Sequence, residues 1–198
     1  LCRGEEGSQV HLVIARSGEA ENLEFDITRK NLVLPTVSSQ MLENHTGYIQ
    51  VTEFTEHTAG QFEEALDSLQ GDGMTALIVD LRSNPGGMLT SVCDMLDDIL
   101  QKGLLVYTED RSGKRVDYTS TDEKTLDLPL AVLVNGYSAS ASEIFAGAIQ
   151  DRKAGTIIGT TTYGKGVVQS ILTLKDGSAF KITTNRYFTP SGTCSQEI

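Results

Sequence analysis

The segment LPLAVLVNGYSASASEIFAGAIQD, residues 128–151, decides the fold of this chain. It opens with a continuous apolar run of strand length, 128–135. Apolar residues of its second half recur at helical spacing: Ile144, Phe145, Ala148 and Ile149. Small residues between the halves, including Ser138, Ser140 and Ser142, predict a tight turn. A buried strand that leads through a turn into a helix is the building unit of an α/β fold.

The same unit recurs on both sides of this segment. The runs TALIVDLR (75–82) and GTIIGT (155–160) are further strands, expected to be buried on both faces. The first is followed by a helical stripe, namely Leu89, Val92, Leu96, Ile99 and Leu100. Upstream, a strand over 47–54 precedes a helix that ends at Gly71, with Thr58 and Gln61 spaced as a capping box. Strands alternating with helices predict an α/β core with right-handed crossovers.

Other segments of the sequence do not follow this alternation of strand and helix. Partial alternation over 8–16 and 23–29 predicts a hairpin of two half-exposed strands, and the polar residues 35–46 suggest a connector. The charged stretch 109–127 is expected to form a surface excursion. Two strands at the end, separated by the Asp-Gly turn of 175–178, predict an antiparallel pair.

Composition limits the possible functions. The chain has 198 residues, 39% hydrophobic and 22% charged, as in an ordinary globular protein. A net charge of −11 argues against nucleic acid as a partner. No apolar run approaches the ~18 residues of a membrane span, and no signal segment is recognisable, so the chain reads as a fragment or mature piece. Three widely spaced cysteines support neither a disulfide framework nor a zinc site, and no metal or cofactor is predicted.

The serine-rich turn is a candidate nucleophile site. Ser140 and Glu143 have the spacing of a capping box, which would use this serine at the helix start. A helix N-terminus also suits a nucleophile, because its free amides and dipole stabilise developing negative charge. Spacing alone does not choose between these roles, or among the three serines.

A nucleophilic serine needs a base. The three histidines, His11, His45 and His57, all precede the core loops, and none has a supporting Asp or glycine context. A lysine can replace histidine when burial or a neighbouring charge lowers its pKa toward neutrality. Lys165, between two glycines in the loop 160–166, is the best-placed candidate, so a Ser-Lys dyad is the economical interpretation.

Two glycine-rich loops complete the candidate site. In DLRSNPGG (80–87), Pro-Gly-Gly forces a tight turn with bare amides, so Gly86 and the residue after the nucleophile could form an oxyanion hole. The loop from Gly159 to Lys165 fits the start of a phosphate-binding motif, G-x-x-x-x-G-K. Gly166 then replaces the required Ser or Thr, and a strand-like run follows instead of a helix, so nucleotide binding is the weaker alternative.

Three blocks between residues 80 and 169, DLRSNPGG, VLVNGYSASASEIFAGAIQD and GTTTYGKGVVQ, resemble the C-terminal processing (tail-specific) serine protease family in order and content. The resemblance implies an endopeptidase with a Ser-Lys dyad on a crotonase-like α/β core, acting on protein or peptide substrates near their C-termini. A non-catalytic peptide-binding module is the alternative.

The resemblance also assigns the site. It implies Ser140 as nucleophile, Lys165 as base, Gln169 as the residue that orients the base, and the amides of Gly86 and Ala141 as oxyanion donors. Some members use an aspartate that matches Asp151. Eleven helical residues place Asp151 about 16 Å from Ser140, which argues for capping or packing.

Finally, the resemblance implies an organisation and a location. Residues 1–34 look like the C-terminal remnant of a PDZ domain, 35–46 connect it to the core, and 47–198 form a C-terminally truncated catalytic core. Members of the family usually act outside the cytoplasm, so an extracytoplasmic location is expected.

Overall fold

The computed structural model describes residues 2–121 and 126–195. The chain divides into two compact units, Leu1–Leu34 and Pro35–Ile198. The first unit contains the predicted hairpin: β1 (Gln9–Ile14) pairs antiparallel with β2 (Leu23–Thr28).

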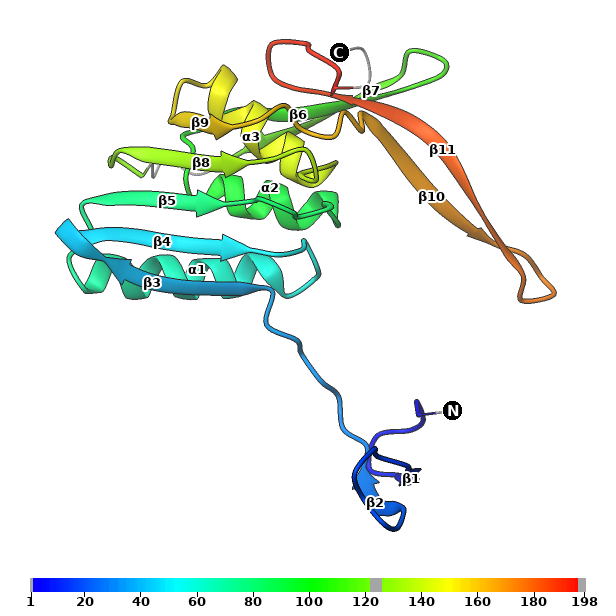
Figure 1. The fold of residues 1–198 in the computed structure, drawn as a ribbon. Coiled ribbons are helices and arrows are strands. Elements are labelled where there is room, and N and C mark those ends of the chain that lie inside the picture. Colours follow the sequence, from blue (N-terminus) through cyan, green and yellow to red (C-terminus); the bar gives the residue numbers. More distant parts are fainter. Residues whose placement is uncertain (1, 122–125, 196–198) are drawn as a thin grey trace. The chain divides into compact units, whose positions relative to one another are not determined.

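A five-stranded sheet forms one layer of the second unit, in the order β3-β4-β5-β8-β9 (Figure 1). Its strands are β3 (Val37–Leu42), β4 (Thr46–Val51), β5 (Ala76–Asp80), β8 (Leu130–Val134) and β9 (Thr156–Gly159). All neighbours are parallel except β3, which pairs antiparallel with β4 across the short 3₁₀ turn Glu43–His45. The mixed α/β class predicted from the sequence is confirmed.

Strand β3 lies in the segment that was expected to be a connector. Val37 and Met41 pack against the core, while the residues between them are exposed. The side-chain oxygen of Gln61 accepts the N–H groups of Thr36 and Val37, which anchors the start of the strand. An edge strand buries so little surface that its sequence looks polar, which explains the wrong expectation.

Three helices cover one face of this sheet (Figure 1): α1 (Thr58–Gly71), α2 (Leu89–Asp97) and α3 (Ala141–Asp151). The sheet grows in one direction from β4 to β9, and right-handed crossovers then place every connecting helix on the same side. Burial alternates along β5 and β8, with half-buried residues on the other face. The expectation that these strands and β9 are buried on both faces is therefore wrong, and β9 is mostly exposed.

A second, four-stranded antiparallel sheet has the order β10-β11-β6-β7. Its strands are β6 (Gly103–Asp110), β7 (Arg115–Ser120), β10 (Val167–Thr173) and β11 (Ala179–Phe188). Helices α2 and α3 contact β6, and α2 also contacts β7, so these two helices have a sheet on either side. Strand β7 falls in the charged stretch that was expected to be a surface excursion, of which 122–125 lie outside the described residues.

The hairpin β10–β11 has the predicted Asp-Gly turn. Gly177 adopts φ +84°, and the Asp176 carboxylate accepts the N–H and hydroxyl of Ser178. In the described part of the chain, no helix is long and apolar enough to cross a membrane.

Candidate active site

The loops that follow β5 and β8 lie side by side, because these parallel neighbours end at the same edge of the sheet. Two of the three serines hold these loops together. The hydroxyl of Ser138 donates to the carbonyl of Leu81 at 2.7 Å, and that of Ser142 to the carbonyl of Asn84 at 3.0 Å. Both serines are fully buried. Their hydroxyl protons are thus engaged in hydrogen bonds to the backbone, which leaves Ser140 as the candidate nucleophile.

Ser140 has an unusual backbone conformation, with φ 56° and ψ −114°. A non-glycine residue in this region is strained, and such strain clusters at functional sites. The residue ends the tight turn and caps α3, where the predicted capping box with Glu143 is present. A serine hydroxyl that accepts a hydrogen bond still carries a proton to donate, so capping and nucleophilic attack are compatible.

Glu143 does more than cap the helix. Its buried carboxylate accepts the N–H of Ser140 at 2.8 Å, and it also accepts three donors from the loop 160–166. These donors are the hydroxyl of Thr162 (2.8 Å) and the N–H groups of Gly164 (2.7 Å) and Lys165 (2.9 Å). One carboxylate thus joins the nucleophile's turn to the loop of the candidate base. Sequence reasoning found the capping box but not this second attachment.

Tyr187, at the end of β11, contacts the same three residues, Ser140, Glu143 and Lys165. Its hydroxyl donates to the carbonyl of Lys165 and lies 3.3 Å from both the Glu143 carboxylate and the carbonyl of Ser140. Its own N–H donates to the carbonyl of Gly166 at 3.1 Å. Burial, and next the Glu143 charge, raise the pKa of Tyr187, so its phenol stays a donor. Tyr187 opens the block YFTPSG (187–192), which also resembles the family, but no role in the site was predicted for it.

Ser140, Lys165 and Gln169, predicted from three separate positions of the chain, line one cavity of about 380 Å³. Ala141, Met88 and Ile144 form part of its wall, and Lys181 and Tyr187 reach it from β11. No histidine lines it: His57 precedes α1 with its ring 3.4 Å from the Glu56 carboxylate, and the ring of His11 is hydrogen-bonded to Asp26. The candidate nucleophile therefore shares its cavity with lysines.

The two predicted oxyanion donors, Gly86 and Ala141, differ in where their N–H groups stand relative to the cavity and to other acceptors. Ala141 is the first residue of α3 and lines the cavity. The N–H of Gly86 instead donates to the side-chain oxygen of Asn84 at 2.8 Å, so it is occupied. Gly87 lines the cavity, and its N–H has no partner among the described residues. Gly87, one residue after the predicted donor, is thus the glycine of this turn that lines the cavity and keeps an unpaired N–H among the described residues.

An ion pair between the buried Asp80 and the exposed Arg82 supports the start of this turn. Asp80, at the end of β5, accepts three hydrogen bonds from Nε and Nη2 of the Arg82 side chain and one from the Tyr48 hydroxyl. Burial raises the pKa of the Asp80 carboxyl, but the bonds from Arg82 and Tyr48 outweigh it and hold that pKa below its usual value. The carboxylate is therefore ionised and fixes where the turn begins.

Asp151 does not line this cavity. Its carboxylate accepts the N–H of Ser191 at 2.8 Å, so it fastens the turn after β11 to the end of α3. Of the two roles expected for Asp151, capping or packing, this contact between two segments corresponds to packing. Among the described residues, no group of three or more His, Cys, Asp or Glu side chains could hold a metal ion.

The nucleotide-binding alternative is wrong. Strand β10, not a helix, follows the loop from Gly159 to Lys165. The N–H groups of Gly164 and Lys165, which would cradle a phosphate, donate to the Glu143 carboxylate. A buried anion occupies the place where a phosphate would have to bind.

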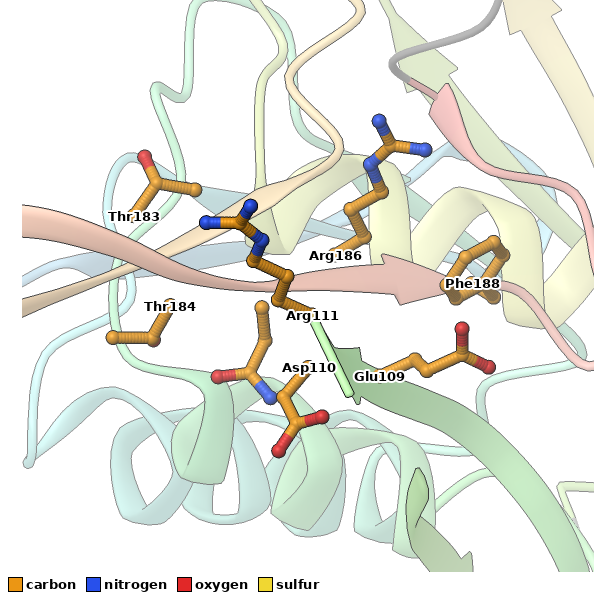
Figure 2. Close-up of a pocket in the computed structure, with 8 residues that line it drawn as sticks. Glu109, Asp110, Arg111, Thr183, Thr184, Arg186 and Phe188 are labelled. Carbon is orange, nitrogen blue, oxygen red and sulfur yellow. The ribbon is translucent and has the colours of Figure 1, made fainter. Parts of the chain in front are cut away.

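A second cavity, of about 390 Å³, lies where β6 ends beside β11 (Figure 2). Figure 2 shows the guanidinium groups of Arg111 and Arg186 together with the carboxylates of Glu109 and Asp110 around it. Asp110 also binds its own hairpin turn through Ser112. None of the predicted site residues lines this cavity, and its charges are balanced.

Comparisons with known proteins point to one family. The model of peptidase family S41 matches residues 45–198. A carboxyl-terminal-processing protease of Synechocystis sp. is 38% identical over 192 residues, which cover 95% of this chain and 45% of that protein. The carboxy-terminal processing protease CtpA of Bacillus subtilis is 37% identical over 193 residues, covering 97% of this chain and 41% of that protein.

A solved structure agrees with these matches. The photosystem II D1 C-terminal processing protease is similar with a TM-score of 0.75 and 31% identity, over 98% of this chain and 54% of that one. The chain spans about half the length of the proteins it matches. By sequence and by fold, the chain belongs to peptidase family S41.

Proposed function

We propose that this protein is a serine endopeptidase in which Ser140 is the nucleophile and Lys165 the base. One observation carries the proposal: Ser140 and Lys165 line the same cavity, while the hydroxyls of Ser138 and Ser142 are bonded to buried carbonyls. Membership of family S41, and relatives named as carboxyl-terminal processing proteases, support the reaction class.

In the first step, the Ser140 hydroxyl oxygen attacks the scissile carbonyl carbon and its proton passes to the neutral Lys165 amine. The tetrahedral intermediate then collapses, the C–N bond breaks, and the lysine returns the proton to the leaving amine. A water molecule, deprotonated by the same lysine, hydrolyses the resulting ester. Gln169, which lines the cavity four residues after Lys165, would orient the lysine through its side-chain amide.

The oxyanion would be stabilised by the amide of Ala141 and by one from the turn 84–87. Gly87 offers a free amide in this structure, whereas Gly86 would first have to release Asn84. The dipole of α3 adds to the stabilisation, since Ser140 stands at its N-terminus.

The finer organisation belongs to the same proposal. The catalytic core would be crotonase-like, and residues 1–34 would be the end of a PDZ domain. The substrates would be polypeptides cut near their C-termini, as the names of the relatives suggest. One relative, from Arabidopsis thaliana, is named as chloroplastic, and this chain would also act outside the cytoplasm.

Substitution of the dyad tests the proposal. Ser140→Ala and Lys165→Ala should each abolish hydrolysis of an unstructured protein substrate while the protein stays folded, and loss of the helix cap should lower the melting temperature of Ser140→Ala only modestly. Ser140→Ala should also abolish labelling by a fluorophosphonate probe. Lys175→Ala, at the exposed hairpin turn, is the control and should keep full activity. Full activity in either dyad variant would sink the proposal, and peptide binding without labelling or hydrolysis would favour the peptide-binding module.

A further inference from the structure

The charge of the proposed catalytic cavity is opposite to that of the chain. The whole chain has 27 acidic and 16 basic residues. Among the described residues, Lys165 and Lys181 line the cavity and no acidic residue does, and Lys181 is the lysine that stays charged when Lys165 acts as a neutral base. The cavity of Figure 2, by contrast, combines Arg and Asp or Glu side chains. A local excess of positive charge in an acidic protein favours a negatively charged group of the ligand.

Lys181 is the lysine that the proposed chemistry does not use. It lies on β11 and pairs with Ile171 of β10. Like Tyr187, it lines the cavity, and the two residues lie on either side of a register shift in the pairing of β10 with β11. Among the described residues, its amine has no ion pair or hydrogen bond. Its charge is therefore available to a substrate.

We propose that Lys181 is a substrate-binding residue that recognises a carboxylate of the bound polypeptide, a role that rests on the proposed peptidase function. A carboxylate accepts a charge-assisted hydrogen bond from an ammonium group, which a neutral amide replaces only weakly. The carboxylate can be the α-carboxylate at the end of the substrate or the side chain of an Asp or Glu residue.

The strand geometry limits where this carboxylate lies. Tyr187 contacts the carbonyl of Ser140, and the six residues back to Lys181 span about 20 Å of extended chain. An extended substrate rises by the same amount per residue. The recognised carboxylate is thus expected within about six residues of the scissile bond.

A purely structural role makes a different prediction. Apolar side chains near Lys181 on the hairpin are largely exposed, among them Ile171 (69%), Phe180 (45%) and Ile182 (43%). A lysine among them could serve only to keep this edge soluble. In that case its removal would promote aggregation and would not change the choice between substrates.

Binding and hydrolysis should be measured separately. In the Ser140→Ala background, fluorescence anisotropy would measure the affinity for peptides that end in a carboxylate or a carboxamide, two, four, six or ten residues beyond the cleavage point. A second series of amidated peptides would carry Asp or Asn in the same range. Hydrolysis of the same peptides by the wild-type protein tests the proposed function itself.

We expect about tenfold tighter binding of the best carboxylate peptide than of its amide, which corresponds to one charge-assisted bond. Lys181→Met should remove this preference, Lys181→Arg should keep it, and Lys181→Glu should reverse it. The control Lys175→Met, on the same hairpin, should leave it unchanged. The preference should weaken as salt concentration rises.

The two peptide series identify the source of the carboxylate. A preference confined to the chain-end series assigns the α-carboxylate, and one confined to the Asp series assigns a side chain. Equal affinity for carboxylate and amide peptides in the Ser140→Ala protein would overturn the inference, as would a preference that survives Lys181→Met. Neither result depends on whether the wild-type protein hydrolyses the peptides.

Discussion

One oxygen of the Glu143 carboxylate accepts the N–H of Ser140 at 2.8 Å and the N–H of Lys165 at 2.9 Å. The two residues are 25 positions apart and belong to different segments of the fold. Their backbones are nevertheless held to one buried atom. The relative placement of the proposed nucleophile and base therefore depends on a side chain that takes no part in the reaction.

Glu143→Gln should damage this arrangement. The amide keeps one acceptor oxygen and turns an NH₂ group toward N–H donors, each of which costs about 1–3 kcal/mol when left unsatisfied. We expect a loss of at least 2 kcal/mol in the free energy of unfolding, by that estimate, and a decrease in activity of about 100-fold or more. Urea denaturation and a peptide assay measure both. Glu64→Gln, on the exposed side of α1, should change neither. Wild-type stability of Glu143→Gln would contradict the assignment.

Tyr187→Phe should show whether Tyr187 positions the proposed base, Lys165, or only packs in the core. The ring stays in the core, while the hydroxyl that holds the carbonyl of Lys165 is lost. We expect kcat to decrease about tenfold or more with KM within about twofold, because the base moves but the binding surface remains. Tyr107→Phe is the matched control, since Tyr107 stacks on Phe188 through its ring alone. An unchanged kcat for Tyr187→Phe would show that the hydroxyl does not position the base.

Gly86→Ala should disrupt the turn from inside. Gly86 has φ +101°, and an added Cβ would lie 2.6 Å from the carbonyl oxygen of Ala139 and 2.7 Å from the Cβ of Ser140. We expect loss of activity and of fluorophosphonate labelling. Gly113→Ala, where φ is +83° and nothing lies within 4 Å, controls for backbone strain alone and should stay active. An active Gly86→Ala protein would show that the turn 84–87 can move away from the turn that carries Ser140 without loss of activity.

Asp98→Asn should change how stability depends on pH. Burial, and then the charges of Glu63, Asp97, Asp67 and Asp94, raise the pKa of Asp98 to about 7. The unfolded value is about 3.9, so between these pH values the folded state holds a proton that the unfolded state has released. This contribution to stability is full below about pH 4 and is lost as pH rises through 7.

Asparagine does not ionise, so the stability of Asp98→Asn does not fall in this way as pH rises. Its melting temperature should therefore exceed that of the wild type by more at pH 8 than at pH 4.5, with Asp127→Asn as an exposed control. Differential scanning calorimetry at the two pH values measures this. An equal difference at both values would mean that Asp98 ionises normally in the folded state.

Local signals in the sequence were sufficient for much of the fold. The apolar run 128–135 forms β8, and the helical stripe after Ser140 forms α3. Both patterns involve residues that are close together in the sequence, so they can be recognised without knowledge of the fold. The Asp-Gly turn and the Ser140–Glu143 capping box are also present, since each depends on residues within three positions of one another.

Features that depend on a distant partner were missed. The predicted capping box at Thr58 and Gln61 is wrong, because α1 begins at Thr58 and Gln61 binds the start of β3 instead. The N–H of Gly86 was expected to be free, but the side chain of Asn84 occupies it. Tyr187 reaches Lys165 only through the register of β11, which no spacing in the sequence reveals.

The position of Tyr187 along the chain also affects biosynthesis. A ribosome adds the 47 residues between Ser140 and Tyr187 in roughly 2 to 10 s, at ~5–20 residues per second. During that time the emerging polypeptide carries its serine without the strand that holds the lysine loop. The catalytic cavity is completed only after β11 has been synthesised, so under the proposed function a chain translated no further than Ser140 lacks the means to cleave its own unfolded segments.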